Sequence, residues 1–133
     1  MNRIDLQFLM LAAILLIAGV ALGIFMGISG NFQLSPVHAH INLVGWTSLG
    51  LFGLTYRAYP ELAERKLARV HLLLCAPAAV LLPPGIAISA LYQSPGLAII
   101  ASLLWLGGCA VFLVQLLGLV SVSEGSQAPA PAE

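Results

Sequence analysis

Three polar side chains stand close together in a stretch of chain that is otherwise apolar. They are His38, His40 and Asn42, in the segment PVHAHINLVGW that covers residues 36–46. Imidazole is a common ligand of transition metals, and polar groups inside a membrane are costly unless they have partners. A third histidine, His71, follows a short charged segment. We therefore take a metal-binding or cofactor-binding site as the first hypothesis for this chain.

Helical geometry separates the two neighbouring histidines. Residues two apart on a helix point about 200° away from each other, so His38 and His40 are predicted on opposite faces. His38 shares its face with Asn42 and with small residues, which suits close helix packing or a cofactor. The face of His40 is apolar enough to lie against a porphyrin ring, a lipid or a neighbouring subunit. Trp46 could line a cofactor, although such aromatics more often pack or anchor at an interface.

His71 is predicted near the other membrane surface. It stands close to Arg69 at the start of a helix, so we expect a solvated helix end, with a metal-ligand role as the alternative. Its depth differs from that of the outer histidines by roughly 20 Å, given a hydrocarbon core of about 30 Å, which is too far for one metal ion in one subunit. Gln115 has a similar predicted depth and could form a hydrogen bond with His71.

Composition places these residues in a membrane protein. Of the 133 residues, 60% are hydrophobic and only 8% are charged, and the formal net charge is zero. Lipid-facing segments use up nearly all of this length, so we expect no separate soluble domain and a lipid bilayer as the main partner. The few cations form no stripe, so we expect no nucleic-acid partner. Cys75 and Cys109 stand in separate apolar stretches, which favours packing over redox or metal roles.

The pattern predicts an all-α fold, a polytopic membrane four-helix bundle. Ser35 and Pro36 supply an N-cap and a proline at the first helical position, and Pro60 marks the end of the same helix. Pro77 and the Pro83-Pro84 pair are expected to interrupt and kink the third helix. The four predicted helices cover about residues 6–28, 36–59, 67–91 and 97–122, followed by a disordered tail over 123–133.

Charge sets the predicted orientation. With four spans, every Lys and Arg of the chain falls on one side of the bilayer, namely Arg3, Arg57, Arg65, Lys66 and Arg69. The positive-inside rule makes that side cytoplasmic. We therefore predict a multi-pass protein of the bacterial inner membrane with both termini in the cytoplasm.

The segment PVHAHINLVGWTSLGLFGLTYRAYPE, residues 36–61, resembles the second transmembrane helix of the catalytic subunit of heme-copper oxidases and nitric oxide reductases. Residues 35–74 are also similar to small four-helix membrane proteins described as oxidase subunit I-like. The resemblance implies heme b binding and respiratory-chain proteins as partners. His40 is the implied ligand if the His-x-Asn pattern is matched, and His38 if Pro-x-His is matched. The superfamily's other histidine ligands have no counterpart here, so we do not expect oxygen reduction by this chain alone.

If heme is bound, three interpretations are possible for the second axial ligand of its iron. A symmetric homo-oligomer could supply the same histidine twice, which a row of glycines at Gly19, Gly23 and Gly27 favours. Met26, predicted at a similar depth, could supply His/Met ligation, or the heme could keep an open position for a small gas. The alternative cofactor is copper, held by His38, His40 and Met26 in an oxidase-assembly protein. The third hypothesis is an assembly or interaction protein in which the histidines only cap the helix end.

Overall fold

The computed structural model describes residues 3–126, with side chains described to residue 119, and this part of the chain is helical with no strand. In chain order the helices are α1 (Ile4–Ser29), α2 (Ser35–His40), η1 (Ile41–Ser48), α3 (Leu49–Ala58), α4 (Pro60–Glu64), α5 (Lys66–Tyr92) and α6 (Gly96–Ser126). The all-α prediction is confirmed over the described residues.

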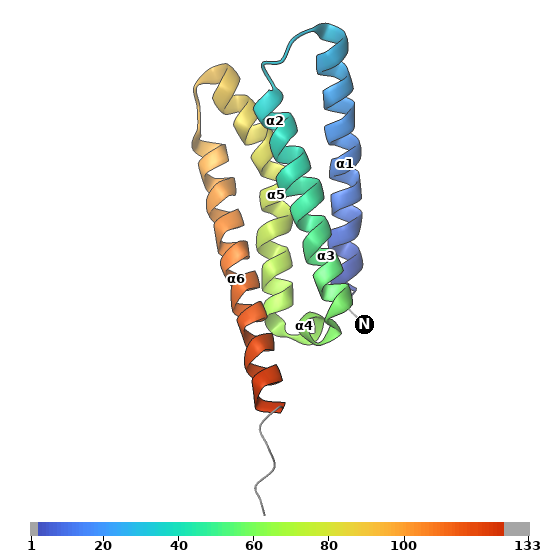
Figure 1. Cartoon of the computed structure of the whole chain (residues 1–133). Coiled ribbons are helices and arrows are strands. Elements are labelled where there is room, and N and C mark those ends of the chain that lie inside the picture. The colour runs from blue at the N-terminus through green and yellow to red at the C-terminus, as the bar shows by residue number, and fades with distance from the viewer. Residues whose placement is uncertain (1–2, 127–133) are drawn as a thin grey trace, which may run out of the picture.

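The segments α2, η1 and α3 follow one another without a break and form a single helical rod, which corresponds to the predicted helix over 36–59 (Figure 1). Its middle part, η1, is a π-helix of eight residues, which the sequence did not predict. Asn42 Nδ2 donates a hydrogen bond to the carbonyl of His38 at 2.8 Å, and Ser48 Oγ donates one to the carbonyl of Leu43 at 2.8 Å. Polar side chains thus bind carbonyls along the stretch where the α-helical pattern is lost.

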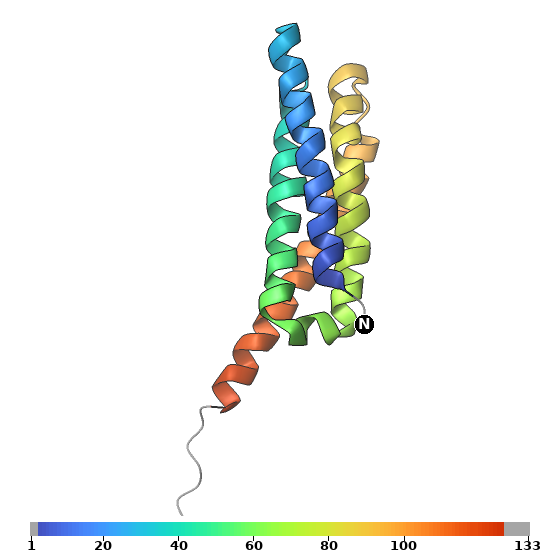
Figure 2. The ribbon, with the colours of Figure 1, turned by 90° about the vertical axis from the view of Figure 1, so that its right-hand side faces the viewer.

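The helices form two hairpins that lie side by side (Figure 1). α1 packs against η1 and α3, and α5 packs along α6. The loops at residues 30–34 and 93–95 lie at one end of the bundle, which we call the loop end. The N-terminus and α4 lie at the other end, where α6 runs obliquely past the bundle (Figure 2). We call it the basic end, because all five Lys and Arg residues lie there.

Among the described residues, three helices have the length and apolar character needed to cross a membrane: α1, α5 and residues 96–119 of α6. Their outward faces carry large exposed apolar side chains, such as Ile17, which is 70% exposed, and Leu113, which is 57% exposed. Such a surface is unfavourable in water and suits contact with lipid. The described chain therefore has the helices of a membrane protein.

One predicted boundary and one predicted interruption are wrong. α6 continues to Ser126, so residues 123–126 belong to a helix rather than to the predicted tail, and residues 127–133 lie outside the described residues. Between Gly96 and Pro129 the sequence has no proline to stop this helix. α5 also continues through Pro77, Pro83 and Pro84 without an interruption.

α6 lies close to α5 just after these prolines. A Cβ on Gly85 would lie 2.7 Å from the backbone nitrogen of Ala98. The backbones of α5 and α6 therefore approach each other at Gly85 more closely than any larger residue allows.

Candidate functional site

His38 is turned toward α1. Its Nδ1 lies 2.9 Å from the carbonyl oxygen of Gly19, and Asn42 Nδ2 lies 3.4 Å from the same nitrogen. A Cβ on Gly23 would lie 2.9 Å from His38 Cε1, and one on Gly19 would lie 2.8 Å from the amide of Asn42. Gly19 and Gly23 thus make room for His38 and Asn42 inside the chain, so this part of the glycine row serves packing within one subunit.

His40 points the other way, as the helical spacing predicts. It is exposed, and its Nδ1 lies 2.7 Å from the carbonyl oxygen of Pro36. A carbonyl can only accept, so Nδ1 carries a proton, and in the neutral imidazole Nε2 then keeps its lone pair. Metal-binding histidines commonly have this arrangement, with one ring nitrogen bonded to a carbonyl and the other free. The imidazole of His40 therefore points outward, with Nε2 turned toward the surroundings of the helix.

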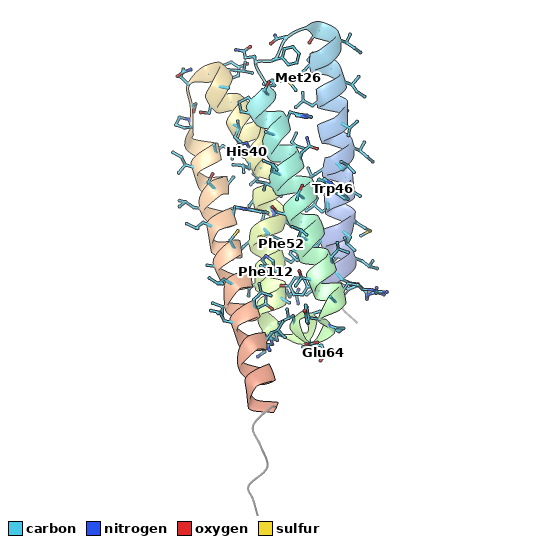
Figure 3. The ribbon with its side chains drawn as sticks, in the orientation of Figure 1. Met26, His40, Trp46, Phe52, Glu64 and Phe112 are labelled. Atoms are coloured by element: carbon cyan, nitrogen blue, oxygen red, sulfur yellow. The ribbon has the colours of Figure 1, made fainter. Side chains whose placement is uncertain are left out.

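The other predicted members of the outer site do not join His40. Met26 is buried at 5% exposure near the loop end, whereas His40 is exposed (Figure 3). Trp46 is 40% exposed and lies on a different side of the helix from His40 (Figure 3). Over the described residues, no three His, Cys, Asp or Glu side chains gather as a metal-binding group. The structure thus leaves His40 separate from His38, Met26 and Trp46.

The prediction of a solvated His71 is wrong, because this side chain is fully buried at 0% exposure. Aromatic rings surround it, with ring centroids at 5.0 Å for Phe8, 4.6 Å for Phe52 and 5.2 Å for Phe112. These rings come from α1, α3 and α6, and Figure 3 labels Phe52 and Phe112 near the middle and lower part of the bundle. Only the packing of three other helices over α5 buries this position.

A chain of hydrogen bonds joins His71 to two other helices. Tyr56 Oη, on α3, lies 2.8 Å from His71 Nδ1, and Gln115 Nε2, on α6, donates to Tyr56 Oη at 2.7 Å. The sequence predicted Gln115 at the depth of His71, but the structure places the hydroxyl of Tyr56 between them. His71 Nε2 and Gln115 Oε1 are buried with no hydrogen-bond partner in the part of the chain that the structure describes. A half-satisfied polar network of this kind is costly in an apolar interior.

A cavity of about 750 Å³ opens at the basic end. The residues that line it are Arg3, Ile4, Asp5, Tyr56, Arg57, Pro60, Ala63, Glu64, Arg65, Lys66 and Arg69. Arg3 and Arg57 both pair with Asp5, at 3.1 and 3.3 Å. Sequence reasoning used these cations only to orient the chain. The clustering of these cations at one end could be read from the sequence, but it does not indicate that they line a cavity.

Comparisons with protein-family models, with curated proteins and with solved structures found no match for this chain. The function must therefore be inferred from the structure itself, in which three groups of polar side chains are candidate sites. They are the exposed His40 toward the loop end, the buried network around His71, and the cation-lined cavity at the basic end.

Proposed function

We propose that the chain crosses the bacterial inner membrane four times, with the rod over residues 35–58 as the second span and the basic end in the cytoplasm. The rod has 24 residues and a length of roughly 35 Å, enough for a hydrocarbon core of about 30 Å. It runs antiparallel to α1 in the same bundle (Figure 1). The positive-inside rule then assigns the end with all five cations to the cytoplasm, and both termini with it.

Cysteine labelling tests this topology. In a Cys75→Ala/Cys109→Ala background, single cysteines replace Asn31 in the loop after α1 and Glu61 in α4. A membrane-impermeant maleimide should label the Asn31→Cys protein in intact spheroplasts and the Glu61→Cys protein only after lysis. Labelling of both sites from the same side would mean that the rod does not cross the membrane.

We propose further that the protein binds heme b through His40. The observation that carries the proposal is the imidazole itself, exposed, with Nδ1 held by the Pro36 carbonyl and Nε2 free of that bond. The likeness of residues 36–61 to an oxidase helix, with His40 in the His-x-Asn pattern, agrees with it. His38 is the weaker choice, because its ring packs against Gly19 and Gly23 of α1, whereas the ring of His40 is exposed. Heme b, when bound, supplies one-electron transfer or the binding of a small gas.

The residues fit one axial position and not two. His40 lies on an exposed apolar face with Leu43, which is 63% exposed. A closed two-fold dimer brings the same residue of both copies together, so a second His40 is the second ligand in this proposal. Because His38 and Asn42 of the same chain fill the space at Gly23 and Gly19, the proposed dimer forms over the face of His40 rather than over these glycines.

The absorption spectrum of detergent-purified protein tests heme binding. We expect a Soret band that shifts on reduction and that is lost in His40→Ala. His38→Gln is the matched control, because its amide can still donate to the Gly19 carbonyl, and it should keep most of the heme. Imidazole added to His40→Gly should restore the band, because it replaces the missing ligand directly.

Three results would count against this proposal. A protein that is colourless and stays colourless after reconstitution with hemin would refute heme binding. Copper found in such a preparation would favour the copper-binding alternative. Loss of heme in His38→Gln with retention in His40→Ala would exchange the roles of the two histidines. A stoichiometry of one heme per monomer, rather than one per two chains, would refute the ligation of one heme by two copies of His40.

A further inference from the structure

The cavity at the basic end holds an excess of positive charge. Five cations line it against two carboxylates, Asp5 and Glu64, which leaves a net charge of +3 on its wall. These five are all the Lys and Arg residues of the chain. Its volume of about 750 Å³ lies within the range of about 300–1,000 Å³ usual for ligand pockets. The positive charge of the chain is therefore gathered around this cavity.

The excess positive charge is concentrated at the start of α5. Asp5 pairs with both Arg3 and Arg57, so their charges are partly balanced. Among the described residues, no carboxylate lies within 4.0 Å of the charged groups of Arg65, Lys66 and Arg69. These three residues stand at the start of α5, where the positive end of the helix dipole adds to their charge.

The structure holds the guanidinium of Arg65 in place. Its Nη1 lies 3.4 Å from the carbonyl oxygen of Gln115 on α6, and a Cβ on Gly118 would lie 2.5 Å from the same nitrogen. Gly118 thus provides the space that the guanidinium occupies. A cation fixed between α5 and α6 loses less side-chain freedom on binding an anion than a free surface arginine does.

We propose that this cavity binds a phosphate group, with Arg65, Lys66 and Arg69 as its ligands. Guanidinium and ammonium groups are the usual partners of phosphate oxygens, and basic pockets at the cytoplasmic ends of transmembrane helices recognise anionic headgroups. The phosphate belongs either to an anionic phospholipid or to a soluble phosphate compound. This site is independent of heme binding, because it lies at the end of the bundle opposite the loops.

Two measurements on the full-length protein distinguish the sources. In nanodiscs of equal parts phosphatidylcholine and phosphatidylglycerol, native mass spectrometry should show phosphatidylglycerol retained on the protein in preference to phosphatidylcholine if the ligand is a lipid. Calorimetric titration with inorganic phosphate in dodecyl maltoside should show saturable binding if the ligand is soluble. Either result supports the site and identifies its source. Absence of both overturns it.

Variants test the geometry. Arg65→Gln, which removes one charge, should weaken the observed binding at least tenfold. Arg3→Gln removes one charge that Asp5 already balances and should weaken binding less than threefold. Gly118→Ala should weaken binding with no change of charge, because it displaces the Arg65 guanidinium, and Gly27→Ala is its control for folding. Equal effects of Arg3→Gln and Arg65→Gln would indicate general attraction to a basic surface and refute a built site.

Discussion

Tyr56→Phe tests the buried polar network directly. The change removes one oxygen atom and keeps the ring that stacks on Phe8 at 5.7 Å. That oxygen makes two hydrogen bonds, to His71 at 2.8 Å and to Gln115 at 2.7 Å. Without it, both partners become fully unpaired, since His71 Nε2 and Gln115 Oε1 have no partner among the described residues already. The variant should therefore be less stable.

The expected loss follows from the number of bonds. A net contribution of about 1 kcal/mol per hydrogen bond in soluble proteins gives about 2 kcal/mol for two. Hydrogen bonds between transmembrane helices average about 0.6 kcal/mol, which gives about 1.2 kcal/mol. Unpaired buried partners add to both values. We expect Tyr56→Phe to lower the free energy of unfolding by about 1–3 kcal/mol.

Unfolding by SDS in mixed micelles, followed by circular dichroism, measures this quantity. The decisive control is the triple variant Tyr56→Phe/His71→Leu/Gln115→Leu, which removes every polar atom of the network. Replacing all partners with apolar groups of similar shape is nearly neutral, so the triple variant should be more stable than Tyr56→Phe alone. An unchanged stability in Tyr56→Phe would refute the network as described. So would a triple variant whose loss of stability equals the sum of the losses measured for Tyr56→Phe, His71→Leu and Gln115→Leu separately.

Two further predictions concern the contact between α5 and α6. A Cβ on Gly108 would collide with Cys75 Sγ, so Gly108→Ala should lower the free energy of unfolding by about 1–3 kcal/mol, and adding Cys75→Ala should recover most of the loss. Thermal unfolding of the single and double variants checks this, and equal stabilities would contradict it. Gly85→Ala should cost about 1–3 kcal/mol in the same assay and find no such rescue, because the colliding atoms are the backbone of Leu97 and Ala98. Gly27→Ala, with nothing within 4 Å, is the control and should not destabilise.

The helices could be predicted from the sequence because their signals are local. Long apolar runs, Pro36 at a helix start and the turn at residues 93–96 fix most boundaries to within a few residues. The same local geometry predicted that His38 and His40 lie on opposite faces, since two residues of helix fix their relative direction. The collection of all cations at one end also follows from the order of the helices along the chain.

Only the tertiary structure decided what each polar residue touches. His71 stands near Arg69 in a charged stretch of sequence, but Phe8, Phe52 and Phe112 cover it from three other helices. Its partner Tyr56 is 15 residues away, and Gln115 is 59 residues from Tyr56. The π-helix after His40 and the cavity at the basic end likewise could not be predicted from the pattern of apolar and polar residues. Burial and hydrogen bonding of this kind depend on which helices meet, and the sequence of one helix carries little information about its neighbours.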